Sequence, residues 1–87
     1  MADLKKQFEA ASQAAQKLDR RPDNDQLLEL YALYKQGTSG DVQGSRPGLL
    51  DIAGRAKFDA WTKRKGMTRD AAMQAYVALV TKLQKAG

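Results

Sequence analysis

Two tyrosines and a lysine on one predicted helix are the side chains best suited to chemistry in this 87-residue sequence. Tyr34 and Lys35 follow Tyr31 by three and four residues, a spacing that places side chains at adjoining positions on one helical face. A tyrosine ring can stack on a base and donate to phosphate, while lysine supplies a charge suited to a phosphate dianion. The motif therefore indicates a surface that could hold a nucleotide head group.

The same spacing also fits two tyrosines at the edge of a core, with the stem of Lys35 lying along the surface. From the motif alone this second interpretation is favoured. Lys57 lies beside Phe58 and four residues before Trp61, so it offers a second cation near an aromatic surface, with the same two interpretations. Tyr76 is a polar position in an aliphatic stripe, where it could point into a cavity or bond to the backbone.

The sequence contains neither histidine nor cysteine. This excludes serine triads, cysteine nucleophiles and zinc sites built on those residues. The carboxylates are dispersed singly and lack the spacing of a calcium-binding loop, and nothing supports catalysis by Lys or Asp pairs. We therefore expect no enzyme activity, no metal site and no cofactor.

Composition and charge are those of one small soluble domain covering residues 1–87, with 43% apolar and 29% charged residues. The net charge of +5 is uneven, because residues 1–43 carry −1 and residues 44–87 carry +6. This balance favours an anionic partner without choosing among nucleic acid, a membrane surface and a phosphorylated small molecule. No window is long and apolar enough to span a bilayer, and the first ten residues lack a signal-peptide core, so we expect a cytoplasmic protein.

Apolar residues at three- and four-residue steps predict helices over residues 4–18, 23–37 and 68–85, and the third predicted helix covers 51–65. Asp3, Thr68 and a capping box of Asp23 with Gln26 are the expected start signals. Gly37 is the expected end of the second helix. Residues 37–48 hold four of the seven glycines and predict a long irregular connection, which matches no phosphate-loop pattern. No strand pattern is present, so the sequence predicts an all-α four-helix domain.

Six blocks in order resemble the acyl-coenzyme A binding protein family over nearly the whole chain. Besides Phe8, they are LYALYKQGTSGDV from Leu30, RPGLLD from Arg46, AKFDAW from Ala56, KGMT from Lys65 and AMQAYV from Ala72. The resemblance implies an up-down-down-up four-helix bundle with a long overhand connection between the second and third helices. It also implies a non-catalytic intracellular carrier that binds, protects and delivers long-chain acyl-CoA thioesters.

The resemblance further implies roles for individual residues. Tyrosine at the head-group cluster contacts the adenine and the 3′-phosphate, lysine pairs with that phosphate, and a tyrosine of the fourth helix closes on the ligand. The implied binding residues are Tyr31, Ala32, Leu33, Tyr34, Lys35, Lys57 and Tyr76. Candidates for the acyl groove are Leu27, Leu28 and Phe58.

This sequence departs from the family pattern at three positions. Gln16 and Ala53 stand where members often carry lysine, so the resemblance does not supply those two phosphate contacts. Lys17 and Arg55 are neighbouring cations, but a shift of one or two residues turns a helical side chain to another face. Phe58 replaces the more usual tryptophan and keeps an aromatic wall of different shape.

Two other functions fit the residues without the resemblance. The basic second half could bind nucleic acid, with strong salt dependence, although no nucleic-acid-binding signature is present. A groove could instead accept a partner helix. With the resemblance we expect acyl-CoA as ligand, acyl-CoA-using enzymes as partners, no nucleic acid, no stable membrane insertion and a monomer.

Overall fold

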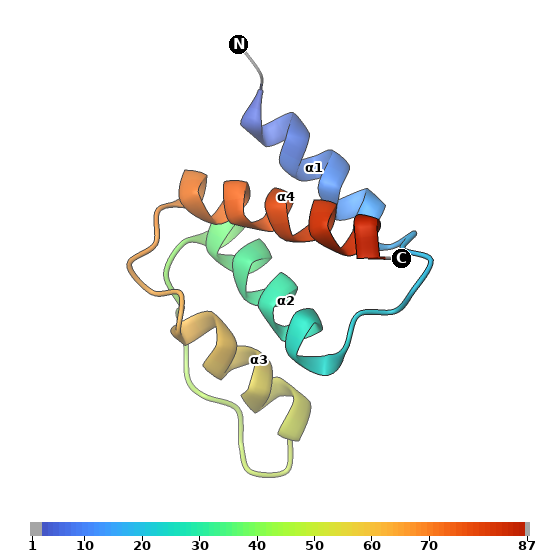
Figure 1. Ribbon diagram of the computed structural model, residues 1–87. Helices are drawn as coiled ribbons and strands as arrows, with labels where there is room; N and C mark the ends of the chain where they lie inside the picture. Colours follow the sequence, from blue (N-terminus) through green and yellow to red (C-terminus); the bar gives the residue numbers. More distant parts are fainter. Residues whose placement is uncertain (1–2, 87) are drawn as a thin grey trace.

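The computed structural model describes residues 3–86, which form four α-helices and no strand (Figure 1). The helices are α1 (Leu4–Ala15), α2 (Asn24–Ser39), α3 (Ile52–Thr62) and α4 (Arg69–Ala86). α4 packs against both α1 and α2, while α3 packs against α2. The predicted all-α, four-helix class is confirmed.

The helix starts follow the capping signals in the sequence. The Asp3 carboxylate accepts hydrogen bonds from the amides of Lys5 and Lys6, at 3.0 and 3.4 Å. Asp23 and Gln26 form the reciprocal capping box at the start of α2. α3 and α4 are capped by Asp51 and Thr68.

Two helix ends come earlier than predicted. α1 ends at Ala15 instead of residue 18, because the next turn tightens into a Lys17 N to Ala14 O hydrogen bond of 3.0 Å. α3 ends at Thr62 instead of residue 65, where the Arg64 amide likewise bonds three residues back, to Trp61 O at 2.9 Å. At both ends the chain therefore leaves the helix through one narrower turn.

α2, in contrast, continues through Gly37 to Ser39, so the predicted end at Gly37 is wrong. Gly37 is buried, and a Cβ added there would lie 3.2 Å from Met73 Cγ and 3.4 Å from Phe8 Cζ. This glycine thus allows close packing instead of ending the helix. The end comes at Gly40, whose φ of +83° and ψ of −151° are available only to glycine.

The hydrophobic core lies between α1, α2 and α4. Its buried members are Phe8, Ala11, Leu30, Leu33, Tyr76 and Val80. α3 contributes one large buried side chain, Trp61. Since α3 packs against α2 and against neither α1 nor α4, it lies beside this three-helix core and not inside it.

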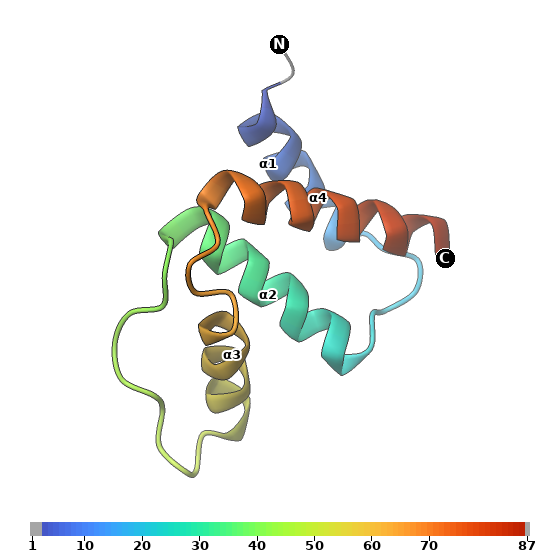
Figure 2. The same ribbon diagram turned by 60° about the vertical axis from the view of Figure 1, so that its left-hand side comes forward.

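α2 and α3 run in the same direction (Figures 1 and 2), so the chain must travel back along α3 before α3 begins. The long connection after Gly40 makes this return, as the predicted up-down-down-up arrangement requires.

Buried polar contacts tie this crossing together. The Gln36 side chain is fully buried, and its Nε2 donates to Asp41 Oδ1 and to Met67 O, both at 2.8 Å. The amide of Gly66 also donates to Asp41 Oδ1 at 2.8 Å. These bonds lower the pKa of the Asp41 carboxyl, with the Gly66 bond contributing most and Gln36 next. The end of α2 is thereby fixed to the turn between α3 and α4.

Candidate functional site

Two cation–ring contacts connect α2 with α3. Lys57 Nζ on α3 lies 5.5 Å from the centre of the Tyr31 ring, and Lys35 Nζ on α2 lies 5.0 Å from the centre of the Trp61 ring. Each helix contributes one ring and one cation, four residues apart, with the ring first on α2 and the cation first on α3. The parallel register of α2 and α3 therefore brings the two predicted lysines to one junction with aromatic faces.

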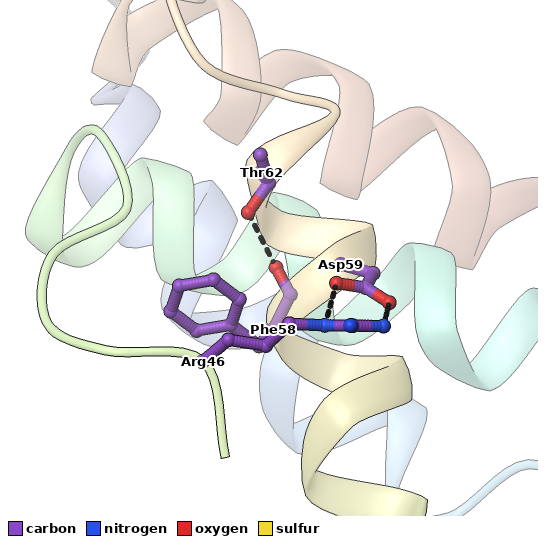
Figure 3. A network of polar contacts seen from close by, with 4 residues as sticks. All are labelled: Arg46, Phe58, Asp59 and Thr62. Carbon is purple, nitrogen blue, oxygen red and sulfur yellow. Dashed lines mark hydrogen bonds and ion pairs between the residues drawn. The ribbon is translucent and has the colours of Figure 1, made fainter. Parts of the chain in front are cut away.

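Neither lysine forms a salt bridge within residues 3–86. Arg46, in contrast, is fully engaged: its Nε and Nη2 donate to the two carboxylate oxygens of Asp59 at 3.0 and 2.7 Å (Figure 3). This pairing lowers the pKa of the Asp59 carboxyl and raises the pKa of the Arg46 guanidinium. Lys35 and Lys57 are therefore two cations at the α2–α3 junction that have no carboxylate partner.

Three aromatic rings meet on the other side of α2. Phe8 from α1 stacks on Tyr34 with 5.4 Å between ring centres, and it meets Tyr76 from α4 edge-on at 5.0 Å. The Tyr34 and Tyr76 rings are 5.9 Å apart. Tyr76 is 5% exposed, and its burial, with a smaller effect of Tyr34, raises the pKa of its hydroxyl. Tyr34 is 41% exposed and can present a ring to a ligand while the other two rings support it.

A hollow of about 310 Å³ opens beside these tyrosines. It brings together Leu27, Tyr31, Tyr34 and Tyr76 of the predicted site, and its wall also includes Gln16 from the end of α1. Its lining combines aliphatic side chains with three tyrosines. It can therefore accept a ligand that has both apolar and hydrogen-bonding parts.

The remaining predicted residues lie elsewhere. Leu28 and Ala32 line a second hollow of about 510 Å³ between α2 and α3, with Ala56, Ala60 and a charged rim that includes Lys63. Leu33 is a core residue with 2% exposure. Leu27 and Leu28 thus face different hollows, as consecutive residues of a helix must.

Phe58 lines neither of these two hollows. Its carbonyl accepts the Thr62 hydroxyl at 2.8 Å, and its ring and the Asp59 carboxylate project to different sides of α3 (Figure 3). The structure therefore places the predicted head-group side chains in two groups, the lysines toward α3 and Tyr34 with Tyr76 toward α1 and α4, and Tyr31 contacts both. It separates the three groove candidates.

Two residues gain a role at the site that the sequence did not assign. Trp61 donates from Nε1 to Gly40 O at 2.9 Å, which holds its ring where Lys35 lies over it. Phe8 stacks on Tyr34 and sets the position of that ring. A signal for Trp61 was present, because Lys57 and Trp61 repeat the four-residue spacing of Tyr31 and Lys35.

Within residues 3–86, no group of three or more carboxylates stands close enough together to hold a metal ion. Over the same residues, no helix combines the length and the apolar character needed to cross a bilayer. Unpaired lysines next to aromatic rings, on a helical scaffold with hollows beside them, suit a ligand that is anionic and aromatic. Fold and site together define a small helical ligand-binding domain.

Comparison with known proteins identifies the family. The model of the acyl CoA binding protein family matches residues 5–80. An acyl-CoA-binding protein homolog of Drosophila melanogaster is 46% identical over 77 residues, covering 88% of this chain and 90% of that protein. Homolog 1 of Caenorhabditis elegans is 49% identical over 76 residues, covering 87% and 88%. The crystal structure of Oryza sativa acyl-CoA-binding protein 2 superposes with a TM-score of 0.92 at 36% identity, covering 97% and 93% of the two chains.

The chain belongs to the acyl-CoA-binding protein family. Proteins of this family bind acyl-CoA as a carried ligand and are not catalysts. The resemblance carried by the six sequence blocks is thereby confirmed.

Proposed function

We propose that this protein carries long-chain fatty acyl-CoA thioesters, with its tyrosines and lysines holding the nucleotide end and apolar side chains holding the acyl chain. The observation that carries the proposal is the pair of cation–ring contacts between α2 and α3, Lys57 on Tyr31 and Lys35 on Trp61. Two cations without a carboxylate partner, each against a ring, are suited to a phosphorylated adenine nucleotide.

For the head group, we propose that Tyr31 and Tyr34 contact the adenine and the 3′-phosphate. Lys35 would pair with that phosphate, and Lys57 would add a second charge from α3. Lys35 is half-buried and Lys57 is exposed, so both ammonium groups can move from an aromatic ring to an oxygen anion at small cost. Tyr76 would support Tyr34 from α4 and close one wall of the ligand site.

For the acyl chain, we propose a path from the Tyr31–Lys57 contact toward the start of α2, where Leu27 and Leu28 lie on two sides of the helix. Ala32 would form part of the same floor, since it lines the hollow that contains Leu28. Phe58 would contribute through its ring at the outer side of α3. Leu33 would act through the core beneath the site.

The two ends of the ligand contribute differently. Burial of ten methylenes at about 0.8 kcal/mol each gives roughly 8 kcal/mol as an upper limit, so chain length should dominate affinity. Each charge-assisted contact of Lys35 or Lys57 adds about 1.5–3 kcal/mol, so the head group should distinguish a CoA thioester from a free fatty acid.

We also propose that residues 1–87 form a single acyl-CoA-binding domain. The protein would act as a cytoplasmic monomer and pass its ligand to acyl-CoA-using enzymes. The match of the family model to residues 5–80 supports the single domain.

The proposal is tested by titration calorimetry with palmitoyl-CoA below its micelle concentration, with free CoA and free palmitate as separate ligands. We expect one-to-one binding that is far tighter for the thioester than for either half. Equal affinity for palmitoyl-CoA and free CoA would contradict the acyl groove. Absence of binding to all three ligands would overturn the proposed carrier.

A further inference from the structure

Within residues 3–86, no charged side chain lines the hollow of about 310 Å³ beside the tyrosines. Its wall is made of aliphatic residues, a proline, three tyrosines, one serine and Gln16. The two lysines of the proposed head-group site lie instead at the α2–α3 junction, where Lys35 and Lys57 each contact an aromatic ring. The hollow is therefore suited to an uncharged part of a ligand whose charged groups bind nearby.

The cations that follow Gln16 in the sequence belong to other surfaces. Lys17 lines a hollow between the end of α1 and the end of α4. Arg20 and Arg21 line a further hollow, between the connection after α1 and the last turn of α4. None of these three residues lines the hollow that contains Gln16. The end of α1 thus presents an amide, and not a charge, to the tyrosines.

The backbone of Gln16 is fixed, while its side chain is exposed. Gln16 ends α1 with φ −78° and ψ −13°, and its backbone amide donates to Gln13 O at 3.2 Å. The Ser12 hydroxyl, also in the wall, already donates to Glu9 O at 2.7 Å. Gln16 is therefore placed to offer both a donor and an acceptor to a ligand in the hollow.

The chemistry of the amide favours one kind of ring. A glutamine side chain presents a carbonyl acceptor and an amino donor side by side, and adenine presents an amino donor beside a ring-nitrogen acceptor. The two groups can form a pair of hydrogen bonds. A tyrosine hydroxyl, in contrast, rotates to donate or accept and so distinguishes bases poorly. Tyr34, which is 41% exposed, can supply a ring face for stacking.

An alkyl chain fits this hollow less well than a base. It would cover the Gln16 amide and the tyrosine hydroxyls without offering them a hydrogen-bond partner, which costs free energy. A purine base supplies such partners at its edge and stacks through its face.

We propose that Gln16 is a specificity-determining residue that selects adenine at the nucleotide end of the ligand. Its carbonyl would accept from the 6-amino group of the base, and its amino group would donate to a neighbouring ring nitrogen. This inference rests on the proposed function, because it requires the CoA nucleotide to bind beside Tyr31. It assigns recognition of the base to the end of α1 and recognition of the phosphate to α2 and α3.

The test is titration calorimetry with palmitoyl-CoA and with its 1,N6-etheno derivative, in which a two-carbon bridge removes the 6-amino hydrogens. Gln16→Ala should weaken binding of palmitoyl-CoA by about tenfold, the size of a lost pair of hydrogen bonds to adenine. It should not weaken binding of the etheno derivative, since that pair is already absent. Gln13→Ala is the matched control, because Gln13 is exposed, lies three residues earlier and is outside the hollow.

Palmitoyl-dephospho-CoA, which lacks the 3′-phosphate, separates the base from the phosphate. Gln16→Ala should lose the same tenfold on this ligand. Lys35→Ala should lose little on it, because the phosphate that Lys35 is proposed to bind is missing. The melting temperature of Gln16→Ala should equal that of the unaltered protein, since alanine adopts the same helical backbone.

Three outcomes would overturn recognition of the base by Gln16 alone. One is unchanged affinity of Gln16→Ala for palmitoyl-CoA. Another is an equal loss on palmitoyl-CoA and on the etheno derivative, because the side chain would then act without the 6-amino group. The third is a loss that disappears with the dephospho ligand, which would place Gln16 at the phosphate. Absence of palmitoyl-CoA binding by the unaltered protein would instead overturn the carrier function, and recognition of the base with it.

Discussion

The two flanks of α2 are built in opposite ways. On the flank toward α1 and α4, Leu30 and Leu33 are 7 and 2% exposed and pack with Phe8 and Val80. On the flank toward α3, Tyr31 and Lys35 face a cation and a ring instead of an aliphatic layer. The first flank holds the fold, and the second leaves unpaired charges beside aromatic faces.

This difference explains how so small a domain could have a site without losing its core. Buried aliphatic area is concentrated between three helices, so α3 is attached mainly by Trp61, small residues and polar ties. Side chains on the α3 flank are therefore able to exchange their present contacts for ligand contacts. Variants on the two flanks should separate stability from binding.

Leu33→Ala is expected to have the largest effect on stability. It removes a buried side chain from the flank toward α1 and α4, so the free energy of unfolding should fall by about 2–5 kcal/mol. Urea denaturation measures this loss, and palmitoyl-CoA affinity of the remaining folded protein should change little, because Leu33 would act on the site only through the core. A small loss of stability with a large loss of affinity would instead place Leu33 in contact with the ligand.

Lys35→Ala tests the other flank and should give the reverse pattern. Palmitoyl-CoA binding should weaken by about 1.5–3 kcal/mol, or roughly ten- to a hundredfold, because a charge-assisted phosphate contact is lost. Stability should change by no more than about 1 kcal/mol, the size of a cation–ring contact.

Lys57→Ala should act in the same direction, and Lys82→Ala, an exposed lysine on α4, is the matched control for net charge. If Lys82→Ala weakens binding as much as Lys35→Ala, overall charge and not the α2–α3 junction recognises the ligand. Calorimetry at two salt concentrations completes the comparison.

Gly40→Ala tests the residue that ends α2 and accepts a hydrogen bond from Trp61 of α3. Alanine is strained at φ +83° and ψ −151°, so unfolding free energy should fall by about 1–3 kcal/mol. Because Gly40 O accepts the Trp61 indole at 2.9 Å, tryptophan emission should shift as well. Gly48→Ala is the control, since Gly48 has no positive φ and a Cβ there meets nothing within 4 Å. Equal effects of the two substitutions would contradict a special role for Gly40.

Helix starts could be predicted from the sequence better than helix ends. Asp3 and the Asp23–Gln26 box act through bonds to residues two or three positions away, which a sequence displays directly. Gly37 was wrongly predicted to end α2. Its lack of a side chain instead allows Met73 and Phe8, which lie far away in the chain, to pack closely against the helix. Periodicity contains no information on that contact.

The site shows the same division. The four-residue spacing of Tyr31 and Lys35 indicated one surface, and the structure places both there. The partners across the junction depend on the parallel register of α2 and α3, which came from the family resemblance and not from periodicity. Within α3, Ile52 at the start is exposed and Trp61 near the end is buried. The helix therefore buries one face at its end and leaves its start in solvent.

The smallest predicted effect concerns the hydrogen bonds of Asp41, which connect the end of α2 with the turn between α3 and α4. The bonds from Gly66 and Gln36 lower the pKa of Asp41 below 3.8, so the folded protein gives up this proton at lower pH than the unfolded chain does. The stabilisation is complete above the ordinary pKa and declines as pH falls through the lowered one. Asp41→Asn keeps an acceptor oxygen but does not titrate.

The melting temperature of Asp41→Asn should therefore fall less steeply than that of the unaltered protein as the pH decreases below about 4. Some slope should remain, because Arg46 lowers the pKa of Asp59 and that carboxyl also loses its contribution as the pH falls below its ordinary pKa. Asp41→Asn combined with Asp59→Asn should flatten the profile further. Parallel profiles for the single variant and the unaltered protein would mean that Asp41 ties α2 to the α3–α4 turn through geometry alone, with its charge making no difference.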